Sequence, residues 1–570
     1  PVGINVAWAT SRGTYDYDDW FTQLGKAGCN YARVWITPGI ITLASEKLGE
    51  PQDRYGIGKF DLASSWKLDY VVDLASRNGL YLMICTDSFN TLRMKKDGNH
   101  PFWEETPYNK TNNGPLEKPE DFWTNEAARS LYKNKLRYLV ARYGWSTNVM
   151  CWEFWNEVDC VSPQVYNVDL ITKWHIEMSD YLRNIDPWKH LHATSIGNSN
   201  GEKQFDQLPQ MDFVQTHNYT THDFTALFTE IQKKKEYYKK PHFISEFGWE
   251  GGVDNGKKID PDGVALHNGI WSSLLSGGAG SAAYWWWDSF IHPKNHYAQF
   301  KALTSFIKGV DFDKERFQRI EDAVFSFAEQ PSNKKYRDLR INGPRSWQRY
   351  GINKPTAMKI DRNGKVTVDG EVGGLLHPRA KPFKYNPLTI DMDIDHPTRL
   401  LLRVGEVSGH GGAHLVISID GKVVKDVDMP DPDKMEKLES LTQYAGVYEV
   451  KIPSGKHTVK VDNIGDDWLI VEYILENAIL ENEPDLRLVG LKGTNTSLLW
   501  VQNRDHTWHK VALFRTPVKK QPESILQINN WPNGQYKVVF WDTYKGKQIS
   551  TSNIAVENQK LQLQLPAIEK

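Results

Sequence analysis

The sequence lacks an excess of charge of either sign, and it lacks long hydrophobic runs. Its 570 residues include 69 Lys and Arg against 71 Asp and Glu, a formal net charge of −2. A general electrostatic attraction to nucleic acid or to an anionic membrane requires a positive excess, so the composition excludes that class of protein and favours an uncharged ligand. The apolar runs are all too short for a membrane-spanning helix. Hydrophobic residues make up 40% of the chain, which excludes wholesale disorder and predicts a globular protein.

Cysteine is scarce, and all of it lies early in the chain, at Cys29, Cys85, Cys151 and Cys160. Most of these residues lie in or beside apolar segments that are typical of strands, which favours small buried side chains over a disulfide framework or a metal site. The spacing leaves a disulfide between Cys151 and Cys160 open, so the redox compartment stays undetermined. The first residue is Pro1, and no charged segment followed by a hydrophobic one comes after it. We therefore expect any targeting peptide to have been removed or to lie outside this chain.

Tryptophan, in contrast, is abundant in the front part of the chain. Of the 22 Trp residues, 16 lie before residue 313 and 6 after it. An indole ring has a flat apolar face and a polar edge, which suits core packing and also suits stacking against sugar rings. The front part is therefore where a ligand site is expected.

Short apolar segments alternate with helix-like segments over residues 1–312, a pattern typical of βα units around a parallel sheet. Eight strands are predicted, at Gly3–Trp8, Tyr31–Thr37, Tyr81–Asp87, Val149–Glu157, His190–Gly197, Asp212–Tyr219, His242–Trp249 and Ser281–Phe290. No G-x-G-x-x-G segment follows the first of them, which argues against a doubly wound dinucleotide-binding sheet. The predicted fold class is α/β, with a (β/α)₈ TIM barrel over residues 1–312.

After residue 312 the pattern changes to short alternating strands separated by Gly, Asp, Asn and Pro. One set is predicted at 399–404, 414–419, 447–452, 457–461 and 468–474, with a hairpin turn at Asp420-Gly421. A second set is predicted at 498–502, 510–514, 534–541 and 560–565. We therefore expect two all-β sandwich domains, at 358–480 and 481–570, behind a charged, irregular connector at 313–357.

Two carboxylates occupy matching positions at the ends of predicted strands. Glu157 ends the fourth strand and Glu246 lies near the end of the seventh. The active sites of TIM barrels are built at the C-terminal strand ends, and these two strands face each other across the barrel. Hydrolysis of a glycoside requires two carboxyl groups that flank one bond, one as proton donor and one as nucleophile or base. A single such Glu is usually solvated or ion-paired, but two at matching strand ends favour catalysis.

The neighbouring motifs resemble a known family. Five separated motifs fall in order on the predicted strands: Gly28-x-Asn30-x-x-Arg33, Asn156-Glu157, His217-x-Tyr219, Glu246 and Trp285 to Trp287. Over residues 1–310 the chain resembles the clan A glycoside hydrolases, and within them family 5, the cellulases and β-mannanases. The resemblance implies a retaining hydrolase that cleaves a β-linked polysaccharide or oligosaccharide by double displacement, without a metal or another cofactor. β-Mannan or β-glucan is the implied substrate, with a slight preference for mannan.

The resemblance also implies roles for the residues of these motifs. Glu157 is the expected acid/base and Glu246 the expected nucleophile. Arg33 is expected to hold Glu246 ionised, because an opposite charge lowers the pKa of a carboxyl group, and Tyr219 to donate a hydrogen bond to it. The pKa of Glu157 is expected to be raised, because this carboxyl must be protonated in the resting enzyme.

Further residues are expected to bind substrate or to support the pair. Asn156 is expected to contact the sugar 2-hydroxyl, and His217 to orient Tyr219 or the substrate. Glu153 shares the strand parity of Glu157, so we expect it inside the barrel as a structural partner of Arg33.

The tryptophans at the strand ends are candidates for stacking on sugar rings. Trp285 is the expected platform, with Trp8, Trp35 and Trp249 as further candidates. Core packing is the alternative for each of them. Trp286 is expected in the core, because its parity points it away from Trp285.

Residues 454–474 are similar to galactose-binding-like jelly rolls of carbohydrate-binding modules, so the rear domains are expected either to bind sugar or to brace the barrel. The acidic loop 426–433 offers oxygen ligands for Ca²⁺, with a solvated loop as the favoured alternative. The expected partner is a carbohydrate, with no nucleic acid and no membrane span, and the oligomeric state is undetermined. The family resemblance implies a secreted or cell-surface protein. An exo-acting β-glycosidase on another β-linked glycan and a non-catalytic carbohydrate-binding protein on a barrel scaffold are the alternative functions.

Overall fold

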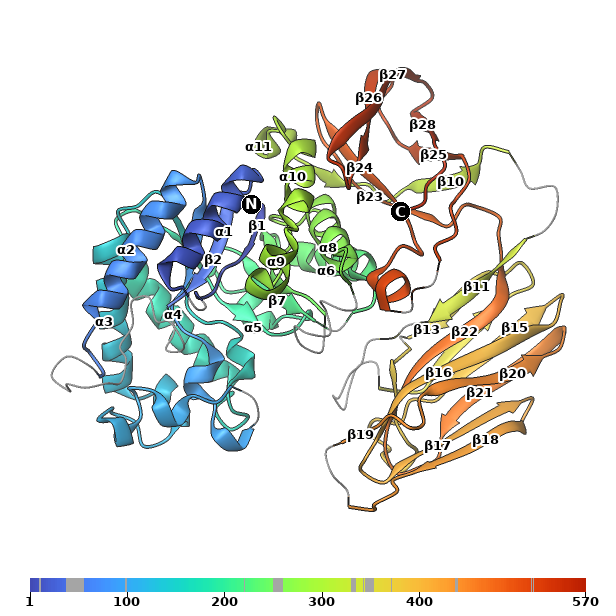
Figure 1. Ribbon diagram of the computed structural model, residues 1–570, viewed down its shortest axis with the longest axis horizontal. Helices are drawn as coiled ribbons and strands as arrows, with labels where there is room; N and C mark the ends of the chain where they lie inside the picture. The colour runs from blue at the N-terminus through green and yellow to red at the C-terminus, as the bar shows by residue number, and fades with distance from the viewer. Residues whose placement is uncertain are drawn as a thin grey trace.

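The computed structural model describes residues 1–9, 12–36, 56–97, 100–219, 221–249, 260–329, 335–341, 343, 353–370, 372–435, 439–513, 515 and 517–570. Figure 1 shows a helix-rich N-terminal part, drawn in blue to green, and strand-rich parts drawn in yellow to red. This is the order of fold classes that the sequence predicts.

Parallel strands form the centre of the N-terminal part. They are β1 (Gly3–Asn5), β2 (Tyr31–Trp35), β3 (Tyr81–Cys85), β4 (Val149–Glu153), β5 (Leu191–Ala193), β6 (Ser195–Ile196), β7 (Val214–Asn218) and β8 (His242–Phe247). β1 to β5 pair in chain order as one parallel run, and β6 to β8 pair as another. Only Thr194 separates β5 from β6, so the two form the fifth barrel strand together.

The segment 281–284 closes the barrel between β8 and β1. Tyr284 makes a parallel bridge with Phe247 at the end of β8. On its other side, the carbonyl of Tyr284 accepts a hydrogen bond of 3.3 Å from the backbone N–H of Asn5 in β1. The eight strand positions therefore form a closed ring, which confirms the predicted (β/α)₈ barrel.

The predicted strand Ser281–Phe290 is too long. The chain leaves the barrel after Tyr284 and turns into the π-helix η8 (Trp287–Ile291). Strand parity therefore does not apply to the tryptophans that follow Tyr284.

Helices follow the strands on the outside of the barrel. They are α1 (Thr14–Lys26), α2 (Leu62–Arg77), α3 (Glu126–Tyr143), α4 (Val168–Ile185), α5 (Lys203–Asp206), α6 (Phe224–Lys235), α8 (Val264–Leu275), α9 (His292–Lys294), α10 (Tyr297–Phe306) and α11 (Phe312–Glu315). Several begin at a side-chain cap that accepts from the free N–H groups of the first turn, as Asn167 does for α4 and Asp223 for α6. All twelve residues of α8 are buried, because the C-terminal strands β23 and β24 pack against it.

Strands make up most of the chain after α11. They are β9 (Gln318–Arg319), β10 (Ala323–Phe327), β11 (Tyr336–Ile341), β12 (Thr356–Ile360), β13 (Val366–Asp369), β14 (Leu375–Leu376), β15 (Leu388–Ile394), β16 (Thr398–Ser408), β17 (Gly412–Ile419), β18 (Lys422–Pro430), β19 (Ser440–Leu441), β20 (Gly446–Ile452), β21 (Gly455–Asn463), β22 (Leu469–Leu480), β23 (Leu486–Lys492), β24 (Ser497–Asn503), β25 (Ser524–Asn529), β26 (Gly534–Asp542), β27 (Lys547–Val556) and β28 (Lys560–Leu565).

Two six-stranded sheets enclose the core of the larger rear part. One has the order β11-β22-β16-β19, with β14 and β20 paired to its strands, and the other has the order β13-β12-β15-β21-β17-β18. Along β15, every second residue is buried, which is the pattern of a strand with one face on a core. The predicted turn at Asp420-Gly421 joins β17 to β18, with φ of 50° and 79° at the two positions, as a type I′ hairpin requires.

The segment 313–357 is less irregular than the sequence predicts. Its described residues contain β9, β10 and β11, which pair with β23, β25 and β22 of the rear sheets. A second difference concerns 510–514, which the sequence predicts as a strand. Its described residues lie in the π-helix η9 (His509–Leu513).

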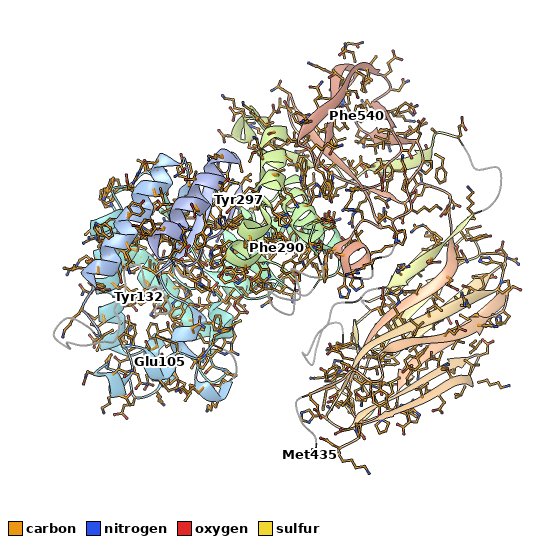
Figure 2. All side chains as sticks on the ribbon, in the orientation of Figure 1. Glu105, Tyr132, Phe290, Tyr297, Met435 and Phe540 are labelled. Carbon is orange, nitrogen blue, oxygen red and sulfur yellow. The ribbon has the colours of Figure 1, made fainter. Side chains whose placement is uncertain are left out.

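The barrel and the two-sheet sandwich have separate apolar cores, and the barrel core extends into the C-terminal part through Val489, Leu498 and Trp500. Tyr132 and Phe290 are fully buried in the barrel part, whereas Met435 is 61% exposed at a tip of the rear sandwich (Figure 2). Among the described residues, no helix is long and apolar enough to cross a bilayer.

Candidate active site

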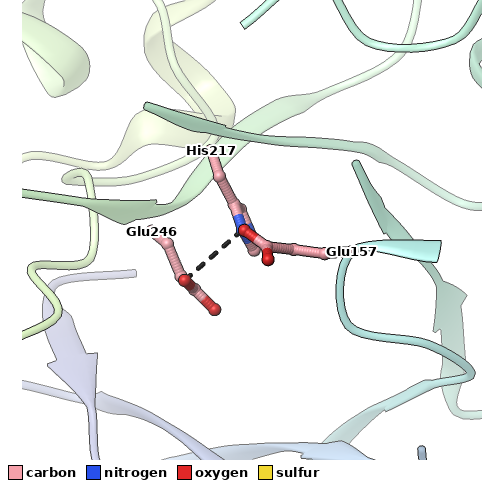
Figure 3. Close-up of side chains that lie close together, drawn as sticks. All are labelled: Glu157, His217 and Glu246. Atoms are coloured by element: carbon pink, nitrogen blue, oxygen red, sulfur yellow. Dashed lines mark hydrogen bonds and ion pairs between the residues drawn. The ribbon is translucent and has the colours of Figure 1, made fainter. Parts of the chain in front are cut away.

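Glu157 and Glu246 come together at the C-terminal ends of β4 and β8. Glu246 lies in β8 itself, and Glu157 lies in the turn after β4 with a left-handed φ of 50°. This backbone region is uncommon for residues other than glycine, and such residues cluster at functional sites. One carboxylate oxygen of each residue lies within 4.8 Å of the other, and Figure 3 shows the two side chains pointing toward one another. The two side chains are 15% and 4% exposed.

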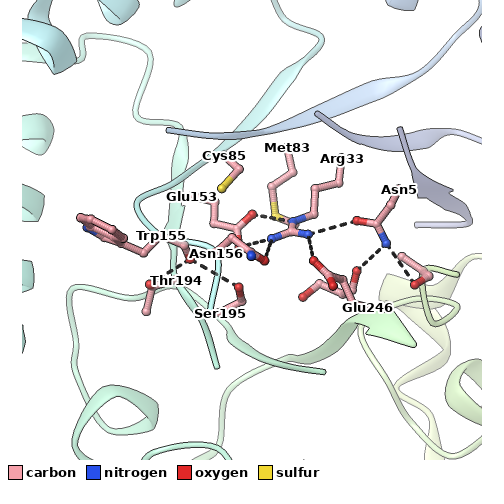
Figure 4. A network of polar contacts seen from close by, with 12 residues as sticks. Asn5, Arg33, Met83, Cys85, Glu153, Trp155, Asn156, Thr194, Ser195 and Glu246 are labelled. Carbon is pink, nitrogen blue, oxygen red and sulfur yellow. Dashed lines mark hydrogen bonds and ion pairs between the residues drawn. The ribbon is translucent and has the colours of Figure 1, made fainter. Parts of the chain in front are cut away.

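Arg33, in β2, lies between two buried carboxylates and uses all five of its N–H groups (Figure 4). Its Nε and Nη2 donate to the two oxygens of Glu153 over 2.6 and 2.7 Å. Its Nη1 donates to Glu246 Oε1 over 2.5 Å and to Asn5 Oδ1 over 3.1 Å. Nη2 also donates to Asn156 Oδ1 over 2.8 Å. The expected pairing of Glu153 with Arg33 is therefore present.

Sequence reasoning missed Asn5 at the end of β1. Its Nδ2 donates to the carbonyls of Ser245 and Ala283 over 2.9 and 3.1 Å, which leaves Oδ1 facing Arg33. The signal in the sequence is an amide side chain in an apolar first strand, at a strand end where barrel sites are built. Its burial and its partners follow only from the closed barrel.

His217 and Tyr219 contact the carboxylate pair from the end of β7. The Tyr219 hydroxyl donates to Glu246 Oε2 over 2.6 Å, as expected. His217 Nδ1 lies 2.8 Å from Glu157 Oε1 and 3.4 Å from Glu246 Oε2, and its Nε2 lies 3.0 Å from Ser245 Oγ. His217 thus bridges the two carboxylates themselves, whereas the sequence predicts that it orients Tyr219 or the substrate.

Burial sets the pKa values of this site. It raises the pKa of Glu157 to about 7, against the opposing charge of Arg33, which agrees with the expectation of a raised value. It lowers the pKa of His217 to about 4, so the imidazole is neutral near pH 7. Burial also raises the pKa of Glu246, although the charge of Arg33 and the hydrogen bond from Tyr219 act in the opposite direction. The charge of Arg33 therefore acts in the expected direction, but burial outweighs it and the net shift is upward.

The turn that carries Glu157 is tied to β6 and to the residue that follows it. The backbone N–H of Glu157 donates to Ser195 Oγ over 3.1 Å, and Asp159 accepts from the backbone N–H of Gly197 over 2.7 Å. A Cβ added at Gly197 would lie 2.7 Å from Cys160 Sγ and 3.2 Å from Glu157 Cδ. The position therefore requires glycine for space. All four cysteines are free thiols, which answers the open question of a disulfide.

The tryptophans divide into two groups. Trp8 and Trp285 are partly exposed with ring centroids 5.5 Å apart, and the buried Trp35 lies 5.3 Å from Trp285. Trp249 is only 3% exposed and stacks on Trp286 at an interplanar angle of 14°. Burial removes Trp249 as a platform for sugar. Trp286 is partly exposed, against expectation, because the strand ends before it.

Within the described residues, two groups of three side chains could supply ligands to one metal ion: Glu157, His217 and Glu246, and Asp431, Asp433 and Glu439. In the first group both oxygens of Glu246 already accept hydrogen bonds, one from Arg33 and one from Tyr219. The fixed positive charge of Arg33 beside this position disfavours a divalent cation. In the second group, Asp431 and Asp433 belong to the predicted acidic loop 426–433, whose first part, up to Pro430, is the end of β18. Two of the three side chains of this group are exposed.

The model of one protein family matches the half of the chain that carries this site. It is described as Cellulase (glycosyl hydrolase family 5), and it matches residues 1–289 of the 570. This chain belongs to glycosyl hydrolase family 5. The family 5 region includes every residue of the carboxylate network described above, together with both groups of tryptophans.

Curated relatives of this family 5 chain include two with mannosidase names. Mannan endo-1,4-beta-mannosidase 3 of Oryza sativa subsp. japonica is 24% identical over 302 residues, which cover 45% of this chain and 61% of that protein. Probable mannan endo-1,4-beta-mannosidase F of Aspergillus flavus is 26% identical over 255 residues, which cover 39% and 49%. The chain thus spans about half to three fifths of the length of these relatives.

Solved structures similar to this chain include the endo-1,4-beta-mannanase from Rhizomucor miehei, at a TM-score of 0.38 and 16% identity, covering 51% of this chain and 88% of that one. The endo-beta-1,4-mannanase from Thermotoga petrophila has a TM-score of 0.39 and 14% identity, and covers 82% and 97%.

Proposed function

We propose that this protein is a retaining β-glycoside hydrolase that cleaves β-mannan by double displacement. The observation that carries the proposal is the approach of Glu157 and Glu246 to within 4.8 Å, at the ends of facing strands of a family 5 barrel. A retaining pair has its carboxyl groups about 5–5.5 Å apart, whereas an inverting pair leaves about 6.5–9.5 Å for a water molecule. The geometry therefore favours attack by a carboxylate over attack by water.

In the proposed first step, a Glu246 oxygen attacks the anomeric carbon while Glu157 gives its proton to the leaving glycosidic oxygen. The bond from sugar to leaving group breaks as the bond to Glu246 forms. Glu157, now a carboxylate, then takes a proton from water, and the resulting hydroxide oxygen displaces Glu246 from the sugar. The raised pKa of Glu157, about 7, keeps it protonated for the first of these steps at mildly acidic pH.

The neighbouring hydrogen-bond donors favour an ionised Glu246 before the first step. Arg33 and Tyr219 each donate to one oxygen of Glu246, so the carboxylate is oriented before the substrate arrives. His217 is neutral near pH 7 and bridges both carboxylates without adding a charge. When Glu246 forms its ester with the sugar it loses its negative charge, which lowers the pKa of Glu157 and suits its change from acid to base.

The preference for mannan rests on the mannosidase names of the curated relatives. Glucose and mannose differ at the 2-hydroxyl, and we propose that Asn156 contacts this group, because Arg33 holds its Oδ1 and leaves its Nδ2 near Ser88 Oγ at the weak distance of 3.5 Å. Trp8 and Trp285, both partly exposed, are the proposed stacking surface for sugar rings.

The test is a product profile on β-mannan, cellulose derivatives, xylan and aryl β-glycosides. We expect wild type to release mannooligosaccharides, Glu157→Gln to release none from the polymer, and Glu246→Ala to be inactive but partly rescued by azide on an aryl glycoside. Glu105→Gln is the matched control, because Glu105 is exposed. A monosaccharide as sole product would indicate an exo-acting enzyme. Binding of a polymer without release of sugar would refute the catalytic proposal.

We also propose the division into a barrel at 1–312, a connector at 313–357, a sandwich at 358–480 and a C-terminal domain at 481–570. The connector differs from a simple linker, because its strands β9, β10 and β11 pair with strands of the two rear domains. Secretion and sugar binding by the sandwich are further proposals, and they rest on the family resemblance and on the jelly-roll-like segment 454–474. Retention of the inactive Glu246→Ala variant on insoluble mannan, with and without competing mannooligosaccharides, tests whether the protein binds the polymer.

A further inference from the structure

Residues 221–223 lie between the end of β7 and the start of α6, and each of them contacts the C-terminal part of the chain. The contacts come from β23 and from the segment at the start of η9. The backbone carbonyl of Thr221 accepts a hydrogen bond of 3.1 Å from Trp508 Nε1. The imidazole of His222 stacks on that of His509, with centroids 3.7 Å apart and an interplanar angle of 19°.

Asp223 accepts two hydrogen bonds from Arg487 of β23, from Nη1 over 2.7 Å and from Nη2 over 2.8 Å. The guanidinium is fixed from behind, because its Nε donates to Gln502 Oε1 over 2.7 Å and Gln502 is only 1% exposed. The Arg487 side chain is itself 14% exposed. A two-point, charge-assisted contact with a pre-oriented guanidinium is stronger and more directional than an ordinary surface ion pair.

Asp223 also begins the next helix. Its Oδ1 accepts from the backbone N–H groups of Thr225 and Ala226 in the first turn of α6. One carboxylate therefore joins three parts of the molecule: the segment that leaves β7, the start of α6 and the three-stranded sheet of β24, β23 and β9. Figure 1 shows η9, the short orange helix, at the edge of the barrel next to these elements.

The held segment begins two residues after Tyr219, whose hydroxyl donates to Glu246 Oε2 over 2.6 Å. On the barrel side, the backbone is fixed as far as Asn218, whose carbonyl accepts from the N–H of Gly248 over 3.3 Å. Beyond Asn218, Trp508, His509 and Arg487 contact residues 221–223 from the C-terminal side. Two local features act on the same segment: the backbone N–H of Asp223 donates to Thr221 Oγ1 over 3.2 Å, and Asp223 caps α6. A displacement of about 1 Å at a reacting group can cost about 100-fold in rate.

We propose that the C-terminal domain is a positioning element of the active site: through Trp508, His509 and Arg487 it holds residues 221–223 and so aims the Tyr219 hydroxyl at Glu246. These three are positioning residues, since their described contacts are with residues 221–223 and not with Glu157 or Glu246. The proposal rests on the proposed hydrolase function. Under this proposal, loss of the contacts lowers kcat on any substrate. Loss of a sugar-binding module would instead weaken binding of the polymer.

The test uses the full chain and a soluble aryl β-mannoside, on which a module for polymer binding has no effect. Trp508→Phe removes the indole N–H with a small loss of volume, and Arg487→Ala removes the two-point contact. We expect each to lower kcat about 10-fold or more with little change in KM. Arg487→Lys keeps the charge and is expected to recover part of the loss.

The decisive comparison is with Tyr219→Phe. If the contacts act through Tyr219, the effect of Trp508→Phe on kcat is much smaller in the Tyr219→Phe background than in wild type, because coupled residues are not additive. A merely structural role gives independent, additive losses.

Trp500→Phe is the matched control. Trp500 lies in β24 of the same domain, is 4% exposed, and packs on Trp271 of α8 rather than on residues 221–223. We expect this variant to lose stability but to keep the wild-type kcat.

The proposal is overturned if the folded Trp508→Phe variant keeps the wild-type kcat. It is also overturned if the losses of kcat in Trp508→Phe and Tyr219→Phe are additive in the double variant. If Arg487→Ala does not fold, Trp508→Phe decides alone. Wild type without any glycosidase activity would instead refute the proposed function, so the two failures are distinguishable.

Discussion

Arg33 binds Glu153 through two parallel hydrogen bonds while its remaining N–H groups reach Glu246, Asn5 and Asn156. Arg33 and Glu153 are both fully buried. A buried ion pair of this kind adds little net stability, but removing one partner leaves the other charge buried and uncompensated. The pair is therefore best understood as a fixed support for the side chain of Glu246.

Arg33→Met tests this support. The substitution leaves Glu153 and Glu246 buried without a counter-charge, so we expect a loss of about 3–5 kcal/mol in the free energy of unfolding, together with loss of turnover. Urea unfolding followed by circular dichroism measures the first effect, and aryl mannoside hydrolysis measures the second. Arg12→Ala is the control, because Arg12 forms an exposed ion pair with Asp19 and no change is expected there. A stable, active Arg33→Met protein would contradict the assigned role.

The pH dependence of activity follows from Glu157. Burial raises its pKa to about 7, and the proposed mechanism requires it protonated in the free enzyme. We therefore expect kcat/KM on mannan to fall as the pH rises through about 7. An acidic limb is expected from Glu246, which must be ionised and whose pKa is also raised by burial. These limbs belong to the coupled pair rather than to single residues. If kcat/KM fell on the basic side only above pH 9, the assignment of Glu157 as the acid would be contradicted.

The same shift predicts a pH dependence of stability. The folded state binds the Glu157 proton more tightly than the unfolded chain, in which the pKa is near its ordinary 4.5. Stability is therefore lost as the pH rises from about 4.5 through about 7, by roughly 3 kcal/mol at most. Glu157→Gln carries no such charge, so we expect its free energy of unfolding to decline less between pH 5 and pH 8. Glu105→Gln should follow wild type, and parallel curves for wild type and Glu157→Gln would count against the raised pKa.

Gly197 provides a steric test of the turn that carries Glu157. A methyl group there would meet Cys160 Sγ at 2.7 Å and Glu157 Cδ at 3.2 Å. We expect Gly197→Ala to lower kcat by displacing Glu157, and Cys160→Ala in the same chain to restore part of it, because removal of the sulfur opens space. Gly446→Ala is the control, since a Cβ there meets nothing within 4 Å. Failure of the second substitution to restore activity would show that the clash with the thiol is not the cause.

The barrel could be predicted from the sequence because each of its strands is marked by a local apolar segment, and this pattern repeats along the chain. The apolar segments correspond to the strands, and Glu157, Glu246, Arg33 and Tyr219 meet because barrel strand ends converge at one face. The net direction of the pKa shift of Glu246 could not be predicted, since it depends on burial as well as on the neighbouring charge.

Other features depend on contacts that are distant in sequence. Asn5 becomes functional only through barrel closure against Ala283. The contacts of Trp508 and Arg487 with residues 221–223 join segments more than 260 positions apart, and no local pattern marks them. The segment 510–514 has an apolar composition that suits a strand, but tertiary packing places its described residues in η9.

The two groups of tryptophans predict opposite effects of truncation. Trp285 is partly exposed beside Trp8, so Trp285→Ala is expected to raise KM for mannooligosaccharides about 10-fold, with a small effect on the free energy of unfolding. Trp249 is 3% exposed and packs between Tyr284, Trp286 and Phe290, so Trp249→Ala is expected to cost about 3–5 kcal/mol of stability with KM unchanged in the folded fraction. Steady-state kinetics and urea unfolding on both variants give the comparison. If Trp249→Ala raised KM while Trp285→Ala did not, sugar would stack on the ring that is buried here, and the assignment of the stacking surface to Trp8 and Trp285 would be wrong.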